Sequence, residues 1–144
     1  MRIDLDDIGI SLDIGDWVHK YVEEIQSWAA RKKPENPFPN LKININDETI
    51  DDLHGLSDIL LDQIKGSLPP EAKFSNIQKF SIGDYKALSV DISGRKHEDM
   101  DILIIMKIIS TGSRMVILSF TLVADTFSEY KDEFQQITNS FKEL

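Results

Sequence analysis

The sequence predicts an α+β domain in which an antiparallel β-sheet carries helices packed on its faces. Three observations support this prediction. The second half of the chain holds four apolar segments separated by polar or glycine-containing turns, which is the pattern of a β-meander. The segment that follows them carries apolar residues at helical spacing. The chain has 144 residues, so we expect residues 1–144 to form a single domain with one core.

The composition indicates a folded, acidic protein. Hydrophobic residues make up 41% of the chain, which argues against disorder. There are 16 Lys and Arg residues against 25 Asp and Glu residues, and the net charge is −9. Such a surface repels nucleic acid and anionic lipid, so we expect no nucleic-acid partner and no membrane insertion. A basic partner is compatible, steered by an acidic rim that includes Asp51, Asp52, Asp58 and Asp62.

The chain contains no cysteine, which excludes disulfides, thiolate nucleophiles and cysteine-based zinc sites. Residues 1–7 lack a basic region followed by an apolar one, so they do not form a signal peptide. The longest apolar run, residues 102–109, contains Lys107 and is too short to span a membrane. As the sequence stands we expect a cytoplasmic protein. The alternative is an exported protein, periplasmic or a lipoprotein, from which an N-terminal signal has been removed.

The first third of the chain is predicted to form a strand, a helix and a second strand. Residues 8–14 alternate apolar with small or polar residues, as a half-buried strand does. Residues 33–40 contain three prolines and are predicted to be an extended connection before an alternating strand over 41–45. A helix capped by Asp16 is predicted over residues 16–32, because an apolar stripe recurs there at helical spacing: Trp17, Val18, Tyr21, Ile25 and Trp28.

A second helix is predicted after this strand. Thr49 can cap its first turn, and Gly66 followed by Pro69-Pro70 ends it. Its apolar stripe consists of Leu53, Leu56, Leu60 and Ile64.

The meander and a closing helix complete the predicted fold. The strands are expected over residues 74–82, 85–92, 102–109 and 115–124. Residues 111–113 form a short turn that makes the last two strands antiparallel. The third strand is apolar on both faces except at Lys107, which indicates a central strand covered on both sides over part of its length. Thr126 and Glu129 have capping-box spacing before the closing stripe of Phe127, Tyr130, Phe134, Ile137 and Phe141.

The sequence holds no catalytic or metal-binding motif. His19, His54 and His97 lie in separate predicted elements without metal-ligand spacing. The acidic hairpin tip at 97–101 lacks the ligand spacing of a calcium loop. We therefore expect a protein that is not an enzyme and that has no cofactor and no specific metal site. A small hydrolase is a third hypothesis, which would require His97 beside His19 or His54 in a cleft.

Two tryptophans offer a candidate binding surface. Trp17 and Trp28 are eleven residues apart and would share one face of the predicted helix. They are either core residues that anchor the helix to the sheet or an exposed pair at an interface, where aromatic residues are enriched. With Tyr85, which opens the second strand of the meander, they are the candidate partner-binding residues.

Several segments resemble the PsbP superfamily, which includes a photosystem II extrinsic protein, DcrB-like lipoproteins and Eag chaperones of secretion effectors. Residues 82–87 are similar to its glycine-containing turn into a strand, and residues 114–121 resemble its penultimate strand. Phe127, Tyr130, Phe134 and Ser140-Phe141 resemble its closing helix, and residues 9–17 its opening strand and Trp. The family often has a strand or loop over 18–35. The resemblance implies an α/β/α sandwich, and members that act as assembly factors, chaperones or ligand-binding lipoproteins without a shared catalytic set.

Two functions follow from these observations. The first is a non-enzymatic binding or accessory protein that docks a protein or peptide on a sheet face or strand edge, with a homodimer as the simplest case. The alternative is a carrier with a cavity between sheet and helices for a small apolar ligand. An exposed apolar patch would favour the first function, and a dry cavity of ligand size would favour the second.

Overall fold

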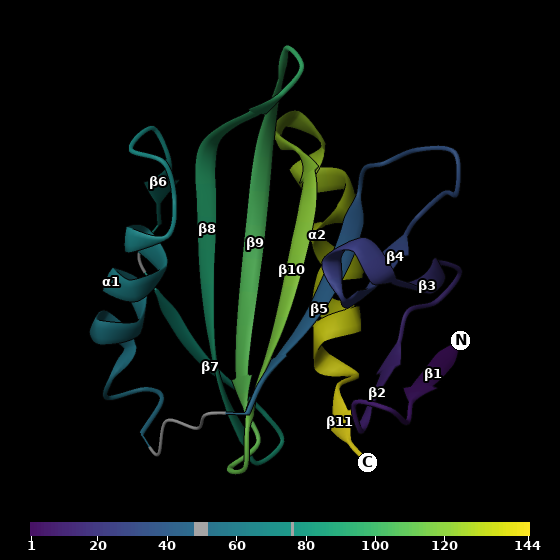
Figure 1. The fold of residues 1–144 in the computed structure, drawn as a ribbon, viewed down its shortest axis with the longest axis vertical. Helices are drawn as coiled ribbons and strands as arrows, with labels where there is room; N and C mark the ends of the chain where they lie inside the picture. The colour runs from purple at the N-terminus through teal and green to yellow at the C-terminus, as the bar shows by residue number, and fades with distance from the viewer. Residues whose placement is uncertain (48–51, 76) are drawn as a thin grey trace.

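The computed structural model describes residues 1–47, 52–75 and 77–144, and within them the fold is α+β (Figure 1). An antiparallel sheet of eight strands runs in the order β3-β4-β5-β10-β9-β8-β6, with β7 also paired to β8. A small three-stranded sheet has the order β1-β2-β11. The predicted antiparallel sheet with helices packed on it is therefore confirmed.

The central strands are long, and β8 and β9 pair with a register shift between Ile92 and Arg95. They are β5 (Asn40–Asn46), β8 (Tyr85–His97), β9 (Met100–Ser110) and β10 (Met115–Val123). Strand β9 lies between β8 and β10, which confirms the prediction of a central strand. The turn at 111–113 joins β9 to β10 as expected, and Gly112 there has a φ of 92° that disfavours other residues. These strands place alternate side chains on two opposite faces.

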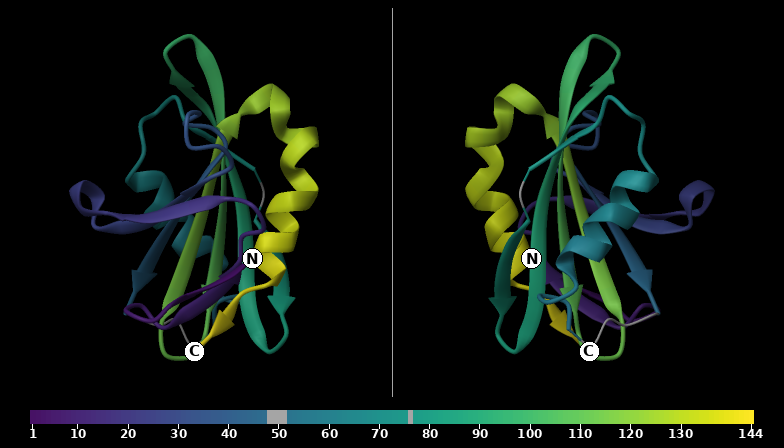
Figure 2. Two further views of the ribbon diagram at one scale, coloured as in Figure 1. Left: turned by 90° about the vertical axis from the view of Figure 1, so that its right-hand side faces the viewer. Right: turned by 90° about the vertical axis from the view of Figure 1, so that its left-hand side faces the viewer.

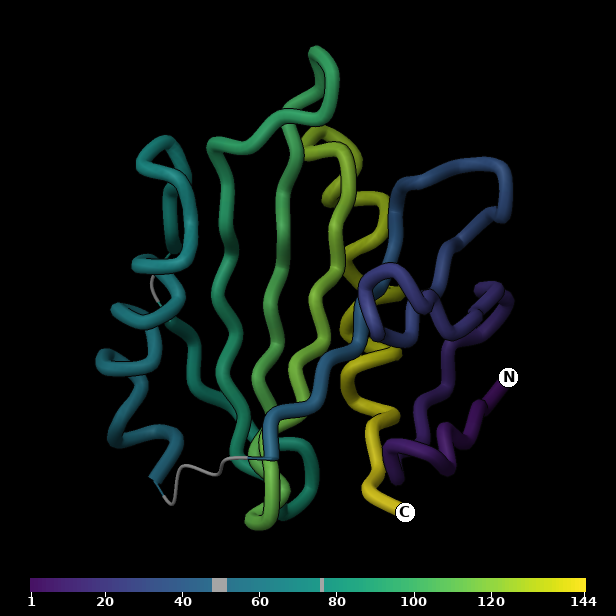
Figure 3. The backbone as a smooth tube through the Cα atoms, in the orientation of Figure 1, coloured from purple at the N-terminus to yellow at the C-terminus, as the bar shows by residue number. Residues whose placement is uncertain are grey.

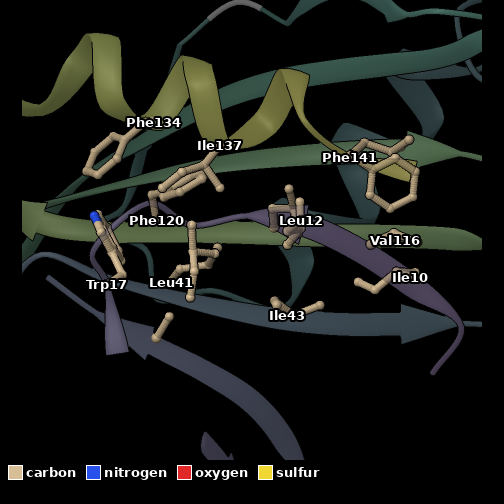
Figure 4. Packing of buried hydrophobic residues seen from close by; sticks show 14 of the residues in the cluster. Ile10, Leu12, Trp17, Leu41, Ile43, Val116, Phe120, Phe134, Ile137 and Phe141 are labelled. Atoms are coloured by element: carbon tan, nitrogen blue, oxygen red, sulfur yellow. The ribbon is translucent and has the colours of Figure 1, made fainter. Parts of the chain in front are cut away.

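One face of the large sheet is covered by helix α2 (Phe127–Asn139) and by the small sheet (Figure 4). The small sheet consists of β1 (Arg2–Leu5), β2 (Ile10–Asp13) and β11 (Lys142–Glu143). Phe134 of α2 is 2% exposed and stacks on Phe120 of β10 with ring centroids 4.6 Å apart. This face holds most of the core, and the predicted strand over 8–14 supplies part of it.

Helix α1 (Ser57–Gly66) lies on the opposite face of the sheet and begins later than predicted. The capping residue expected for it, Thr49, lies outside the described residues. Leu53 and Leu60 are buried with Leu88, Ile108 and Met115 in a second, smaller core. Leu56 is 41% exposed, so the predicted stripe is only partly buried. The segment over 52–56 is a series of turns, and those turns set Leu56 off the helical face.

The helix predicted over 16–32 is wrong. The segment is a hairpin of β3 (Val18–Val22) and β4 (Ser27–Arg31) joined by the short 3₁₀ helix η1 (Glu23–Ile25). Gln26 has a φ of 50° and turns the chain between the strands. Val18 and Tyr21, which belonged to the predicted stripe, remain exposed. Pairing of β4 with β5 outweighs local helical spacing, and β-branched and aromatic residues suit strands.

Two further predictions need correction. The strand expected over 74–82 is two strands, β6 (Lys73–Phe74) and β7 (Gln78–Ile82), which both pair with β8. Thr126 does precede α2, within the 3₁₀ helix η2 (Ala124–Thr126), but its hydroxyl donates to the Val123 carbonyl oxygen at 2.7 Å instead of capping the helix. Both termini belong to the small sheet, since the chain begins at β1 and ends just after β11 (Figure 3).

Candidate binding groove on the open face of the sheet

The two faces of the large sheet are covered to different extents. Helix α2 and the small sheet close one face, whereas α1 packs on the other face against residues of β8, β9 and β10. Figure 2 shows that α1 and the β3–β4 hairpin project to the same side of the sheet, opposite α2. The sheet surface between α1 and this hairpin is the candidate binding surface, and we call it the open face.

The strand register identifies the residues that share the open face, because directly paired residues point to the same side of a sheet. Ser119 of β10 pairs with Met106 of β9 on one side and with Lys42 of β5 on the other. Lys42 in turn pairs with Ala29 of β4, which pairs with Lys20 of β3. A single row of side chains therefore runs from the apolar centre of the sheet to its cationic edge.

A neighbouring row also contains a cation but ends at an apolar residue. Ile104 of β9 pairs with Thr121 of β10, which pairs with Asn40 of β5. Asn40 pairs with Arg31 of β4, and Arg31 pairs with Val18 of β3. Both rows thus begin at an apolar residue of β9 and include a cation farther along, but only the first row ends at a cation.

A groove of about 530 Å³ lies in the open face beside α1. Its floor is apolar and comes from β9 and β10, with Ile104, Met106, Ile108 and Ile117. Leu60 and Ile64 of α1 form one wall. The opposite wall is polar and consists of alternate residues of β5, together with two hydroxyls of β10: Asn40, Lys42, Asn44, Asn46, Ser119 and Thr121.

The electrostatics of the open face contrast with the acidic character of the protein. Lys42 is the charged residue among those that line the groove. A second hollow of about 240 Å³ continues the face at the β3–β4 hairpin, and it is lined by Val18, His19, Lys20, Val22, Ala29, Arg31 and Pro34. Within the described residues, no carboxylate lies within ion-pair distance of Lys20, Arg31 or Lys42.

A separate polar cavity of about 590 Å³ lies between α2 and strands β7–β9. There the Lys107 ammonium donates to the Ser89 hydroxyl at 2.8 Å and lies 5.4 Å from the Phe80 ring centre. Burial lowers the pKa of Lys107, and the charge of nearby Asp91 partly offsets this shift. Burial also raises the pKa of Asp91. Burial therefore disfavours the charged form of each of these two groups.

The three residues predicted to bind a partner lie on the α2 side of the sheet and do not line the groove. Trp17 is 2% exposed, and its indole nitrogen donates to the Glu133 carboxylate. Trp28 of β4 is partly buried and donates to Asp7 at 3.2 Å. Tyr85 packs on Phe141 with ring centroids 5.4 Å apart. The burial of Trp17 thus favours the interpretation that it is a core residue. A partner-binding role for the three residues stays a prediction.

The sequence reasoning missed the groove residues, although their signals were present. Alternation in β5 placed Asn40, Lys42 and Asn44 together on one face. The apolar character of both faces of β9 indicated that Ile104 and Met106 needed a cover. The sequence did not indicate the position of α1, which covers only one end of the rows of side chains on the open face.

The histidines do not come together in a catalytic cleft. His19 contacts the Trp28 ring, and His97 contacts Phe38 near the β8–β9 turn. His54 has its Nε2 3.1 Å from the Phe80 carbonyl oxygen and 3.0 Å from that of Ala87. Among the residues that the structure describes, no group of three or more His, Asp or Glu side chains is placed to hold a metal ion.

Comparison with known proteins identifies the fold. No protein-family model and no curated protein matches the sequence. Among solved structures, cyanobacterial PsbP (CyanoP) from Synechocystis matches with a TM-score of 0.69 and 13% identity, over 100% of this chain and 92% of that one. The protein has a PsbP-like fold.

Two further structures extend this PsbP-like group. LpqN of Mycobacterium tuberculosis, involved in cell envelope biogenesis, matches with a TM-score of 0.66 and 16% identity, covering 99% of this chain and 88% of its own. The Saccharomyces cerevisiae Ran-binding protein Mog1p matches with a TM-score of 0.63 and 11% identity, covering 99% and 94%. No helix in the described part of this chain has the length and hydrophobicity needed to cross a membrane.

Proposed function

We propose that the protein is a non-enzymatic accessory protein, of the assembly-factor or chaperone type, that binds an extended segment of a protein partner in the groove of the open face. The observation that carries the proposal is the half-covered sheet face. Ile104, Met106 and Ile117 are only partly buried and form a continuous apolar floor. An apolar sheet face left partly open marks an interaction site.

The polar wall of the groove favours a peptide over a purely apolar ligand. Side-chain amides of Asn40 and Asn44 both donate and accept hydrogen bonds, as the backbone of an extended peptide requires. Alternate peptide side chains would then reach the apolar floor, in the manner of an extended segment laid on a sheet. The Ran-binding activity named for Mog1p supports a protein partner for this fold.

A carrier of a small apolar ligand is the second candidate. The groove volume of about 530 Å³ lies within the range of roughly 300–1,000 Å³ that small-molecule sites occupy, and its floor is apolar. The cell-envelope role named for LpqN is compatible with either function and with export of this protein.

The test is to fill the groove without removing any core residue. Ser119→Trp places an indole between Lys42 and Met106, where the native side chain is small. Ser113→Trp, at the exposed β9–β10 turn, is the matched control. A fluorescein-labelled peptide of alternating Leu and Ser is titrated, and its anisotropy is measured.

We expect Ser119→Trp to weaken peptide binding by about tenfold or more, a loss of about 1.4 kcal/mol, and Ser113→Trp to leave it unchanged. Equal affinity of wild type and Ser119→Trp would contradict the proposal. A fluorescent fatty acid is titrated in parallel. The carrier function would be established instead if wild type bound the fatty acid but no peptide, and if Ser119→Trp abolished the binding of the fatty acid.

A further inference from the structure

We infer that the partner segment is acidic as well as apolar, with carboxylates that face Lys20, Arg31 and Lys42 while its apolar side chains fill the groove. This inference rests on the proposed function and names the chemistry of the occupant. It follows from three features of the open face: the spacing of the cations, their lack of ion partners, and their position beside the apolar floor.

The cations form a compact cluster set by the strand register. Lys20 and Lys42 flank Ala29 in one row across β3, β4 and β5. Neighbouring strands are about 4.8 Å apart, so the two lysine backbones are roughly 10 Å apart. Arg31 lies on the same face two residues along β4 from Ala29. Three positive charges therefore share an area that a short peptide segment can span.

These charges remain uncompensated in a protein with an excess of acids. The net charge is −9, yet within the described residues the only polar contact of the three side chains is from Arg31 to the Pro34 carbonyl oxygen at 3.5 Å. By contrast, the next residue along the chain, Lys32, bonds both Asp16 and Glu133 at 2.9 Å. Cations that repel one another cost stability, and an acidic ligand would relieve that cost.

The position of the cluster specifies where apolar and acidic groups lie along the ligand. The row through Lys42 continues into Ser119 and Met106, so apolar floor and cationic edge adjoin without an intervening element. Lys42 is also part of the groove wall itself. An extended segment lying across β5 would place apolar side chains over Met106 and Ile117 and carboxylates over the cations.

Local charge, rather than net charge, decides this contact. The net charge of −9 supports a basic partner, as the composition suggested. Screening limits the reach of distant charges to about 10 Å at 0.1 M salt, whereas contacts within the groove are screened much less. The acidic rim of α1, with Asp58 and Asp62, points to solvent and does not line the groove. Lys42 is therefore the charged residue that a ligand in the groove contacts.

The experiment compares three labelled peptides at pH 7, the Glu, Ser and Lys peptides. In each, two Leu residues and then two Glu, two Ser or two Lys residues occupy alternate positions with Ser between them, so that all four of these side chains face the sheet. For wild type we expect the Glu peptide to bind at least about tenfold more tightly than the Lys peptide, with the Ser peptide between them. The variant Arg31→Glu/Lys42→Glu should reverse this order. The control Lys131→Glu/Lys142→Glu makes the same change in net charge at exposed positions away from the open face and should keep the order.

The outcomes separate this inference from the proposed function. Equal or tighter binding of the Lys peptide by wild type, or an unchanged preference in Arg31→Glu/Lys42→Glu, would overturn the inference. If Ser119→Trp still blocked all three peptides, the groove would remain the binding site. If the charge-reversed variant does not fold, Arg31→Gln/Lys42→Gln replaces it, and loss of the preference for Glu is then the expected result.

Discussion

Phe134 shows how a single residue connects the layers of the core. Its ring stacks on Phe120 of the sheet and lies 6.0 Å, centre to centre, from the Trp17 ring (Figure 4). We expect Phe134→Ala to lower the free energy of unfolding by about 3–5 kcal/mol, because the truncation leaves a cavity in a packed site. Urea denaturation measures the change, with Tyr21→Ala as an exposed aromatic control. A loss equal to that of the control would contradict the core assignment.

The partly buried side chains of Asp91 and Lys107 in the polar cavity predict that the stability of the fold depends on pH. Burial raises the pKa of Asp91 in the folded state, so its contribution to stability is greatest below the unfolded pKa of about 3.9 and is lost as pH rises through the folded value. Burial lowers the pKa of Lys107, so its charged form is also disfavoured at neutral pH. Removing both charges should therefore benefit the fold most at pH 7.

The variant Asp91→Asn/Lys107→Met tests this reasoning. Replacing a desolvated pair by neutral residues of similar shape is neutral or stabilising, and partial exposure limits the gain to about 1 kcal/mol. Urea denaturation at pH 4 and pH 7 should show that the free energy of unfolding of the variant increases relative to that of wild type as pH rises. A variant that loses stability relative to wild type over this interval would show that the pair stabilises the fold.

At the scale of elements, the sequence predicted the elements of the meander and the closing helix better than those of the first third. Strands β8 to β10 have alternation and turn residues that agree with their pairing, so local and tertiary preferences coincide. In residues 18–31 the apolar spacing fitted a helix, but the edge of β5 offered a pairing partner that only the folded sheet provides. The Pro-containing connection at 33–40 then returns the chain to β5.

The attachment of α1 gives a prediction for an element. The Phe80 and Ala87 carbonyl oxygens both accept from His54 Nε2, so this nitrogen carries the proton. We expect His54→Ala to cost about 1–2 kcal/mol, since two carbonyl groups lose a donor. Amide hydrogen exchange should accelerate in α1 more than in β9. His97→Ala, near the exposed β8–β9 turn, is the control, and equal exchange in both variants would contradict a role of His54 in holding α1.

At the scale of the whole molecule, the fold was predictable but the location of the binding surface was not. Composition and periodicity indicated an α+β sheet protein, and the resemblance in residues 82–87 and in the closing helix agreed with the PsbP-like fold. The site depends on which face α1 covers and on how β3 to β5 align, and both are tertiary properties. Trp17 was a candidate for partner binding because it is aromatic, whereas its burial in the core gives it a packing role.

Side-chain methyl NMR during titration with the Glu peptide tests the central claim most directly, because neighbouring residues of one strand report on opposite faces. Ile104, Met106 and Ile117 lie in the groove, whereas Ile105 and Leu118 lie in the core on the α2 side. We predict that the methyl signals of the first group shift with the peptide and that those of the second do not. Shifts confined to Ile105, Leu118 and the residues of α2 would contradict binding at the open face.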